Sequence, residues 1–323
     1  MSRSGARCAL PVLCVGNFVA GGAGKTPLAI EIARRLRDLG ERPAFLTRGH
    51  GGSLAGPLLV APGRRAGEVG DEALLLARHA PTVMARSRLA GARLAESSGA
   101  SVIVMDDGLQ NPSLVKDLSL AVVDAETGVG NGLCLPAGPL RAPLARQWPL
   151  VQAAVLVRGA EPSNRGIGES CEALARDARR GGLPVILGSL VPEASEALRG
   201  RKVVAFAGIG RPAKFFATLR SIGAVLVAER GFPDHHVFRK GELEALAAEA
   251  RIKGAVLATT EKDMMRIGAG EAHRAEQAPS VADIPLHVLR VMLLIQDVEA
   301  LDSLIAGALA ARRHSSFPFP GAV

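Results

Sequence analysis

Short apolar runs alternate with segments of helical periodicity along most of the chain. In the first 125 residues, apolar runs predict strands over residues 10–15, 43–47, 82–85, 101–105 and 118–123, with a short strand or hairpin arm at 58–61. Apolar positions three and four residues apart predict helices over residues 26–39, 73–79 and 87–97. Strands that alternate with helices favour a parallel sheet connected by crossover helices.

A stretch rich in Gly, Pro, Leu and Arg interrupts this alternation over residues 127–149, and we interpret it as a long functional loop and bridge. The alternation then resumes. Strands are predicted over residues 153–157, 184–187, 203–207, 224–228, 255–259 and 286–291, and helices over residues 169–180, 212–222, 241–252 and 298–312. This second series predicts another α/β lobe.

A glycine-rich turn with a lysine and a threonine follows the first predicted strand and precedes the first predicted helix. This order of strand, loop and helix is the context of a phosphate-binding P-loop. Backbone N–H groups and the helix N-terminus attract phosphate oxygens, Lys25 can reach the terminal phosphates, and Thr26 can offer its hydroxyl to Mg²⁺. The ATP-binding residues predicted on this basis are Val19, Ala20, Gly21, Gly22, Ala23, Gly24, Lys25 and Thr26.

The match to the common P-loop spacing is not strict, because that spacing would place a glycine where Val19 stands. The sequence Gly-Gly-Ala-Gly-Lys-Thr resembles instead the variant loop of one branch of P-loop proteins. An ordinary turn between a strand and a helix can also carry two glycine pairs. The fold class predicted is α/β, with a P-loop NTPase-type parallel sheet covered by helices on both faces and a second, smaller α/β lobe. The predicted domains are residues 1–150, which bind nucleotide and include the bridging loop, and residues 151–323, which contribute to the cleft.

Two acidic pairs are candidates for chemistry. Asp106 and Asp107 follow an apolar strand and precede Gly108. A strand-end turn is the simpler interpretation of the pair alone, but with the P-loop present we favour the carboxylate of a Mg²⁺ site. Asp71 and Glu72 precede a predicted helix. From spacing alone, a helix-capping role for them is favoured over that of a general base.

Paired histidines follow an aspartate at Asp234-His235-His236. Adjacent side chains rarely bind one metal ion, so the functional interpretation is proton transfer by a His paired with a carboxylate from elsewhere. A surface loop without chemistry is an equal alternative. The sequence Thr259-Thr260-Glu261-Lys262-Asp263 lacks the Asn and the spacing of guanine-reading loops.

Composition narrows the class of partner. The chain has 323 residues, a net charge of +8 and 3% aromatic residues. The positive charge indicates an anionic partner such as a nucleotide, a phosphorylated substrate, a phospholipid surface or a nucleic acid, or else merely scattered solvated charges. Few aromatics and no reading motif argue against nucleic acid. Four cysteines without a C-x-x-C pair indicate a reduced compartment, and no apolar run is long enough to span a bilayer.

Taken together, these features resemble the tetraacyldisaccharide 4'-kinase family, the lipid A 4'-kinases, over nearly the whole chain. The matching motifs are Val15-Gly16-Asn17, Gly21-Gly22-Ala23-Gly24-Lys25-Thr26-Pro27, Arg48-Gly49-His50-Gly51, Gly70-Asp71-Glu72, Asp106-Asp107-Gly108-Leu109-Gln110, Pro136-Ala137-Gly138-Pro139-Leu140-Arg141, Phe232-Pro233-Asp234-His235 and Thr259-Thr260-Glu261-Lys262-Asp263. The P-loop variant followed by Pro and the Asp-Asp-Gly-x-Gln sequence are the most specific of these.

The resemblance implies phosphorylation of the 4'-hydroxyl of tetraacyldisaccharide 1-phosphate by ATP with Mg²⁺, giving lipid IVA in lipid A biosynthesis. It implies that Asp71 is the general base, supported by His235, with Lys25 at the phosphates. It supports Thr26, Asp106 and Asp107 as metal-site residues and adds Glu72 to them. It also adds Gln110, Arg88 and Arg141 for substrate or phosphate contacts. It also implies peripheral contact with an anionic membrane surface, at the cytoplasmic side of the bacterial inner membrane. No nucleic acid and no obligate protein partner are expected.

Two departures from the family pattern stand out. Members usually carry a longer N-terminal segment with an amphipathic helix that docks on the membrane, so we expect either docking through other surfaces or a misassigned start codon. His50 replaces the usual Tyr of its loop. The alternatives are a P-loop ATPase or ligase acting on a soluble metabolite and a nucleotide-switched binding protein. A metallochaperone GTPase of the latter class would carry a Cys- or His-rich tract, which this sequence lacks.

Overall fold

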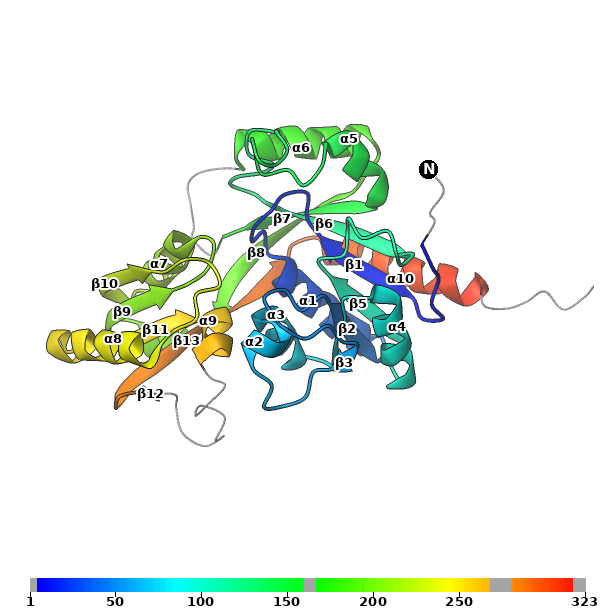
Figure 1. Ribbon diagram of the computed structural model, residues 1–323. Helices are drawn as coiled ribbons and strands as arrows, with labels where there is room; N and C mark the ends of the chain where they lie inside the picture. Colours follow the sequence, from blue (N-terminus) through cyan, green and yellow to red (C-terminus); the bar gives the residue numbers. More distant parts are fainter. Residues whose placement is uncertain (1–4, 160–166, 194, 268–279, 316–323) are drawn as a thin grey trace, which may run out of the picture.

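Thirteen strands joined edge to edge form the framework of the protein, whose computed structural model (Figure 1) describes residues 5–159, 167–193, 195–267 and 280–315. The strands follow the order β10-β9-β11-β13-β8-β7-β6-β1-β5-β2-β4-β3, and β12 pairs with β13. Neighbours are parallel except in the pairs β3–β4, β8–β13 and β12–β13. The α/β class with a mostly parallel sheet is therefore confirmed.

The first lobe contains strands β1 to β8, helices α1 to α6 and the last helix. Its strands are β1 (Val12–Gly16), β2 (Pro43–Thr47), β3 (Leu58–Leu59), β4 (Thr82–Met84), β5 (Val102–Asp106), β6 (Leu118–Asp124), β7 (Ala153–Arg158) and β8 (Val185–Glu193). Its helices are α1 (Lys25–Asp38), α2 (Ala66–Val69), α3 (Asp71–Ala77), α4 (Arg88–Ser97), α5 (Leu144–Gln147), the 3-10 turn Trp148–Leu150, α6 (Glu169–Arg180) and α10 (Val298–Ser315).

The second lobe contains the segments between β8 and α10. Its strands are β9 (Lys202–Ala207), β10 (Val225–Gly231), β11 (Val256–Thr260) and β12 (Ser280–Val281), with β13 (Ile284–Ile295) shared between the lobes. Its helices are the 3-10 turn Ser195–Leu198, α7 (Pro212–Ser221), α8 (Lys240–Lys253) and α9 (Glu261–Ile267).

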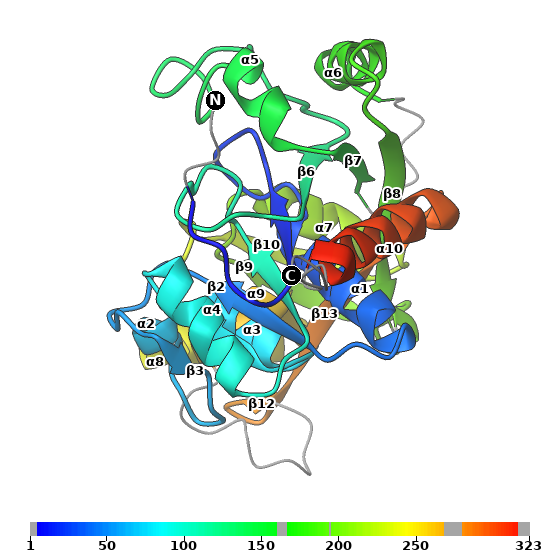
Figure 2. The same ribbon diagram turned by 90° about the vertical axis from the view of Figure 1, so that its right-hand side faces the viewer.

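Helices cover both faces of the first lobe's sheet because successive strand residues point to opposite sides. Leu13 and Val15 of β1 pack in one cluster with α1 and α10, whereas Val12 and Cys14 pack in another with α4. Figure 2 shows α1 and α10 next to each other on one side of the central strands. The two-sided burial explains why these strands are continuous apolar runs rather than alternating ones.

Strand β13 joins the two lobes into one sheet. Residues 286–289 pair in parallel with β11, and residues 290–295 then pair antiparallel with β8. The chain next enters α10, which packs on the first lobe: Leu301 and Ile305 belong to the same core cluster as Ile32 of α1. The division at residue 150 stays a prediction, although β7, β8 and α10 pack with elements from before that residue.

Most element boundaries follow the sequence pattern closely, and the bounds of β2 and α6 coincide with it. Strands β8 and β13 are longer than predicted because their mutual pairing extends them beyond their apolar centres. The short helices α2, α5 and α9 were not predicted, since four to seven residues carry too little periodicity. Helix α5 lies within the bridging segment 127–149.

Replacing Ile305 by Ala should destabilise the protein by about 2–5 kcal/mol, because the side chain is fully buried between α10 and α1 and its loss leaves a cavity. The matched control is Ile252→Ala, where the same change on helix α8 affects a side chain that is 86% exposed and should cost less than about 0.5 kcal/mol. Urea unfolding of both variants measures the difference. Equal destabilisation would mean that α10 does not share the core of the first lobe.

Candidate active site

The loop between β1 and α1 lies at the carboxyl end of the central strand, where parallel sheets place their ligand sites. Gly21 and Gly24 adopt φ angles of +111° and +93°, in the left-handed region that favours glycine. A Cβ on Gly24 would also lie 3.2 Å from Val157 Cγ1. Helix α1 begins at Lys25 directly after this loop, so that its first N–H groups are directed toward the loop.

Side chains from the bridging segment and from the loop after β5 hold this P-loop in place. Gln110 Nε2 donates to Asn17 O at 2.8 Å and to Gln147 Oε1 at 2.8 Å. Arg141 Nε donates to Val19 O at 3.1 Å. The structure thus places Gln110 and Arg141 against the loop backbone, and Arg141 is the more exposed of the two.

Lys25 is nearly buried, with its ammonium 3.4 Å from Gly21 O and 3.7 Å from Asp107 Oδ1. Arg141 Nη2 donates to the other oxygen of Asp107 at 3.1 Å. The carboxylate therefore lies between two cations. Thr26 is buried next to Lys25 at the start of the helix. These residues bring together the lysine, the hydroxyl and one carboxylate that the sequence predicts at a phosphate site.

Asp106, the last residue of β5, is completely buried, and neither of its carboxylate oxygens has a hydrogen-bond partner. Burial raises its pKa to about 7, and the nearby charge of Glu72 adds to the rise. A buried carboxylate without partners is costly unless a cation approaches it. Asp106 therefore fits a metal ion.

Magnesium fits this donor set better than a metal enclosed by protein alone. In the part of the chain that the structure describes, no three His, Cys, Asp or Glu side chains come together as a metal-binding group. Mg²⁺ is usually held by one or two carboxylates together with phosphate oxygens and waters. Asp106 and the Thr26 hydroxyl are the side chains best suited to hold it beside a bound phosphate.

Asp71, the first residue of α3, is buried, and its carboxylate contacts Arg266, His235 and the backbone N–H of Glu72. Its Oδ2 accepts hydrogen bonds from Arg266 Nε at 3.0 Å and Nη2 at 2.6 Å, and lies 3.3 Å from His235 Nδ1. Its Oδ1 accepts the N–H of Glu72 at 3.0 Å. His235 comes from the loop after β10, so the Asp–His pair combines residues from both lobes.

Glu72 forms the second link from α3 to α9. Lys262 Nζ donates to its Oε1 at 2.7 Å. Burial alone would raise the pKa of Glu72, but Lys262, with further help from Lys25 and His235, lowers it to about 2. The carboxylate is therefore charged and lies within the field of the P-loop lysine.

Arg266 was missed by the sequence analysis, although Lys262, four residues before it, lies in a motif that was noted. Helix α9 is too short for its periodicity to be recognised, so that nothing marked Arg266 as an inward-facing residue. The signal that could have found it is the spacing of Lys262 and Arg266, because residues four apart share a helix face.

A second contact between the lobes involves the P-loop itself, and the sequence did not predict it. Arg211, which precedes α7, pairs with Asp124 at the end of β6 and donates to Gly22 O at 3.2 Å. Lys214 donates to the same carboxylate at 2.7 Å. Burial would raise the pKa of Asp124, but these two cations lower it to about 2. The second lobe thus reaches the P-loop backbone directly.

Arg88 is a predicted site residue that stands apart from the others. It is buried at the start of α4, and it donates to Ala85 O at 2.7 Å rather than to the P-loop or the Asp–His pair. Burial lowers its pKa, and its Nε has no hydrogen-bond partner among the described residues. Its role toward phosphate or substrate stays a prediction.

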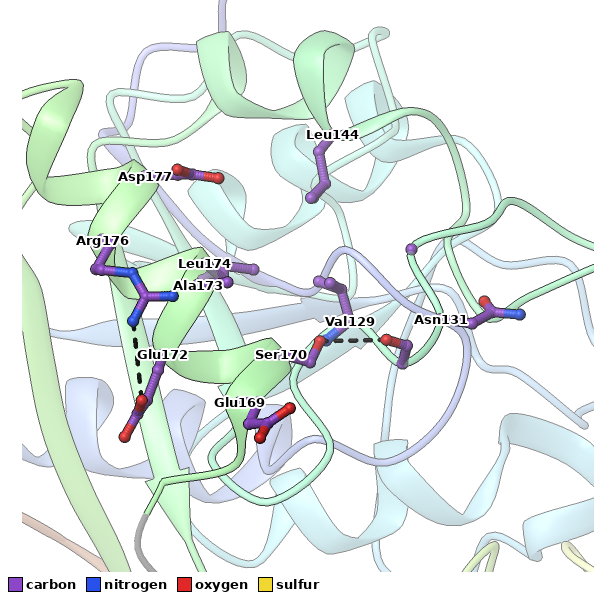
Figure 3. Close-up of a pocket in the computed structure, with 12 residues that line it drawn as sticks. Val129, Asn131, Leu144, Glu169, Ser170, Glu172, Ala173, Leu174, Arg176 and Asp177 are labelled. Carbon is purple, nitrogen blue, oxygen red and sulfur yellow. Dashed lines mark hydrogen bonds and ion pairs between the residues drawn. The ribbon is translucent and has the colours of Figure 1, made fainter.

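A cavity of about 650 Å³ lies apart from these residues, between α6 and the loop 129–132 (Figure 3). Ser170 Oγ accepts the Val129 N–H at 3.1 Å, and both residues line the cavity. Three carboxylates line it, from Glu169, Glu172 and Asp177, against the single guanidinium of Arg176. None of the predicted site residues lines it, and its acidic lining does not suit a polyphosphate.

Comparisons with known proteins identify a family that this chain resembles. The profile of a family described as Tetraacyldisaccharide-1-P 4'-kinase matches residues 2–310. A protein of Methylorubrum extorquens named Tetraacyldisaccharide 4'-kinase is 58% identical over 309 residues, which cover 95% of this chain and 89% of that protein. One of the same name from Methylobacterium radiotolerans is 56% identical over 312 residues, covering 96% and 90%.

A solved structure extends the similarity to the fold. The crystal structure of LpxK from Aquifex aeolicus in complex with ATP superposes with a TM-score of 0.70 at 25% identity, over 94% of this chain and 90% of that one.

Proposed function

The chain belongs to the tetraacyldisaccharide-1-P 4'-kinase family, and from this premise we propose how its residues divide the work of phosphate transfer. It is an ATP-dependent kinase of lipid A biosynthesis that acts on the 4'-hydroxyl of a tetraacyldisaccharide 1-phosphate. The observation that carries the assignment of roles is the pair formed by the buried Asp71 and the partly exposed His235, to which each lobe contributes one residue.

The P-loop, Lys25 and Thr26 bind the phosphates of ATP in this proposal. The transferring phosphoryl group carries negative charge in the transition state, and positive groups fixed in a water-poor site stabilise it. Lys25 is already held by Gly21 O and faces Asp107, so binding phosphate requires little reorganisation of its side chain.

We assign Asp106 and the Thr26 hydroxyl to a Mg²⁺ ion, because Asp106 is the buried carboxylate without partners. The ion would neutralise charge on the β- and γ-phosphate oxygens. Glu72 and Asp107, also predicted as ligands, are paired with Lys262 and Arg141. We propose that these two carboxylates act mainly through their negative charge and by fixing the positions of Lys262 and Arg141.

Asp71 accepts the proton of the sugar hydroxyl in this scheme. The hydroxyl oxygen forms the new bond to the γ-phosphorus while the bond from that phosphorus to the bridging oxygen breaks and ADP leaves. The proton passes to the Asp71 carboxylate, and His235 at 3.3 Å supports the charge change there. Because His235 is partly exposed and Asp71 is not, the histidine faces the side from which substrate arrives.

Contact with a membrane surface is proposed from exposed leucines on one segment. The described helices include none long and apolar enough to cross a bilayer. Leu133, Leu135 and Leu150 are 53%, 57% and 41% exposed, and the same stretch carries the exposed Arg146. Exposed apolar side chains beside cations suit an anionic interface, where an acylated acceptor resides.

Replacing Lys25 by Ala should reduce phosphate transfer at least about 100-fold, because the lysine charge no longer meets the γ-phosphoryl group. The assay follows label from ATP into tetraacyldisaccharide 1-phosphate in detergent micelles, with and without Mg²⁺. The control is Lys240→Ala, whose side chain is 91% exposed and which should keep the full rate. Transfer that survives in the Lys25 variant, or that ignores Mg²⁺, would refute these assignments.

Replacing Asp71 by Asn should lower kcat about 10²- to 10⁴-fold with little change in the KM for ATP, because it removes the proton acceptor and leaves the P-loop intact. His235→Ala should lower kcat less, since the carboxylate remains. Asp177→Asn, on an exposed carboxylate of α6, is the matched control. A normal kcat in the Asp71 variant would mean that Asp71 only begins helix α3 and does not take part in proton transfer.

Replacing Leu133 and Leu135 together by Ser should weaken binding to vesicles that contain anionic lipid, because each leucine loses its apolar contact with the acyl region. Vesicle sedimentation gives the bound fraction, and the rate in detergent micelles should stay unchanged. As a control, Ile252→Ser alters an exposed apolar residue on α8. If the wild type, the double variant and the Ile252 variant bind vesicles equally, the segment with Leu133 and Leu135 does not contact the membrane.

A further inference from the structure

Arg266 is the most completely engaged cation of the described site. Its side chain is 4% exposed. Two of its nitrogens donate to Asp71 Oδ2, and the third, Nη1, donates to Gly208 O at 2.6 Å and to Asp263 Oδ1 at 2.9 Å. A buried guanidinium with all three nitrogens bound has a fixed position and a fixed plane.

The contacts of Arg266 extend to both members of the Asp–His pair. It binds the carboxylate of Asp71 directly. The Gly208 carbonyl that it binds also accepts the backbone N–H of His235 at 3.1 Å. One side chain therefore fixes the position of the carboxylate in the first lobe relative to the histidine loop of the second.

Asp263, one of the acceptors of Arg266, is itself fixed by hydrogen bonds. Asp263 Oδ1 accepts the N–H of Gly208 at 3.0 Å, and Asp263 Oδ2 accepts the hydroxyl of Thr260 at 2.6 Å. The Asp263 carboxylate thereby connects the loop after β9, the end of β11 and helix α9. A motion of any of them would displace the guanidinium and, with it, Asp71.

The two oxygens of Asp71 differ as a result. Oδ2 receives two hydrogen bonds from Arg266 and faces His235 Nδ1, which occupies its lone pairs. Oδ1 receives only the Glu72 N–H, which leaves one lone pair for a further donor. A carboxylate held in this way can rotate little about its Cβ–Cγ bond.

We propose that Arg266 is a positioning residue for phosphate transfer: it immobilises Asp71 Oδ2 and the Gly208 carbonyl, so that Oδ1 is the atom that accepts the proton of the acceptor hydroxyl. This inference rests on the proposed role of Asp71. It requires the planar fork of Arg, since an ammonium can reach Asp71 or Gly208 but cannot hold both oxygens in one plane.

The test is a double-mutant cycle between Arg266 and Asp71, read as kcat and KM in the transfer assay. Arg266→Met should lower kcat about 100-fold, because a base misplaced by about 1 Å loses that much, and should leave the KM for ATP within about 2-fold. Arg266→Lys should recover part of the loss. In the Asp71→Asn background, Arg266→Met should cost less than about 2-fold, because Arg266 acts through Asp71.

The control is Arg220→Met, which removes an exposed arginine paired with Glu229 and should keep the wild-type kcat. Near-ultraviolet circular dichroism checks that each variant is folded. If Arg266→Met does not fold, the cycle is run with Arg266→Lys, whose loss of kcat should likewise vanish in the Asp71→Asn background.

An equal loss of kcat in both backgrounds, or a loss that appears only in the KM for ATP, would overturn the positioning role while leaving Asp71 as the base. A wild-type kcat in Asp71→Asn alone would instead remove the base itself, and the inference with it. The two failures are therefore distinguishable in one set of measurements.

Discussion

Buried charge is the constraint on which the site depends. A charged group removed from water costs several kcal/mol unless an opposite charge and hydrogen bonds compensate it. Helix α3 buries Asp71 and partly buries Glu72, and helix α9 supplies Arg266 and Lys262 as their partners. Neither helix could bury its charges alone. Pairing across the lobes therefore fixes the second lobe against the P-loop side of the first.

The sheet makes this pairing possible. Strand β13 runs parallel to β11 and then antiparallel to β8, so that one continuous strand carries the sheet from one lobe into the other. The loop after β9 then meets the loop after β1 through the contact of Arg211 with Gly22 O, and the loop after β10 meets helix α3 through His235 and Asp71. Helix α10 follows β13 and returns to the core of the first lobe.

Two charged groups of the site, Asp106 and Lys25, are less completely paired than the others, and we propose that ligands bind to them. Asp106 is buried without partners, and Lys25 has only a carbonyl at 3.4 Å and a carboxylate at 3.7 Å among the described residues. Asp106 ends β5, and Lys25 follows the loop after the adjacent strand β1. In the proposed mechanism, phosphate and a divalent cation complete these groups, whereas the Asp71–Arg266 and Glu72–Lys262 pairs form within the protein itself.

The sequence by itself determined the local features: the P-loop between β1 and α1, the carboxylate at the end of β5, and the bounds of β2 and α6. These depend on apolar periodicity, glycine conformation and chain order, which neighbouring residues encode. Spacing alone favoured a helix-capping role for Asp71, and only the family resemblance indicated otherwise. Tertiary structure decided that Arg266, 195 residues away, meets Asp71, that Gln110 and Arg141 hold the P-loop backbone, and that β8 pairs with β13. Such contacts depend on which elements the sheet brings together, and no local pattern encodes that arrangement.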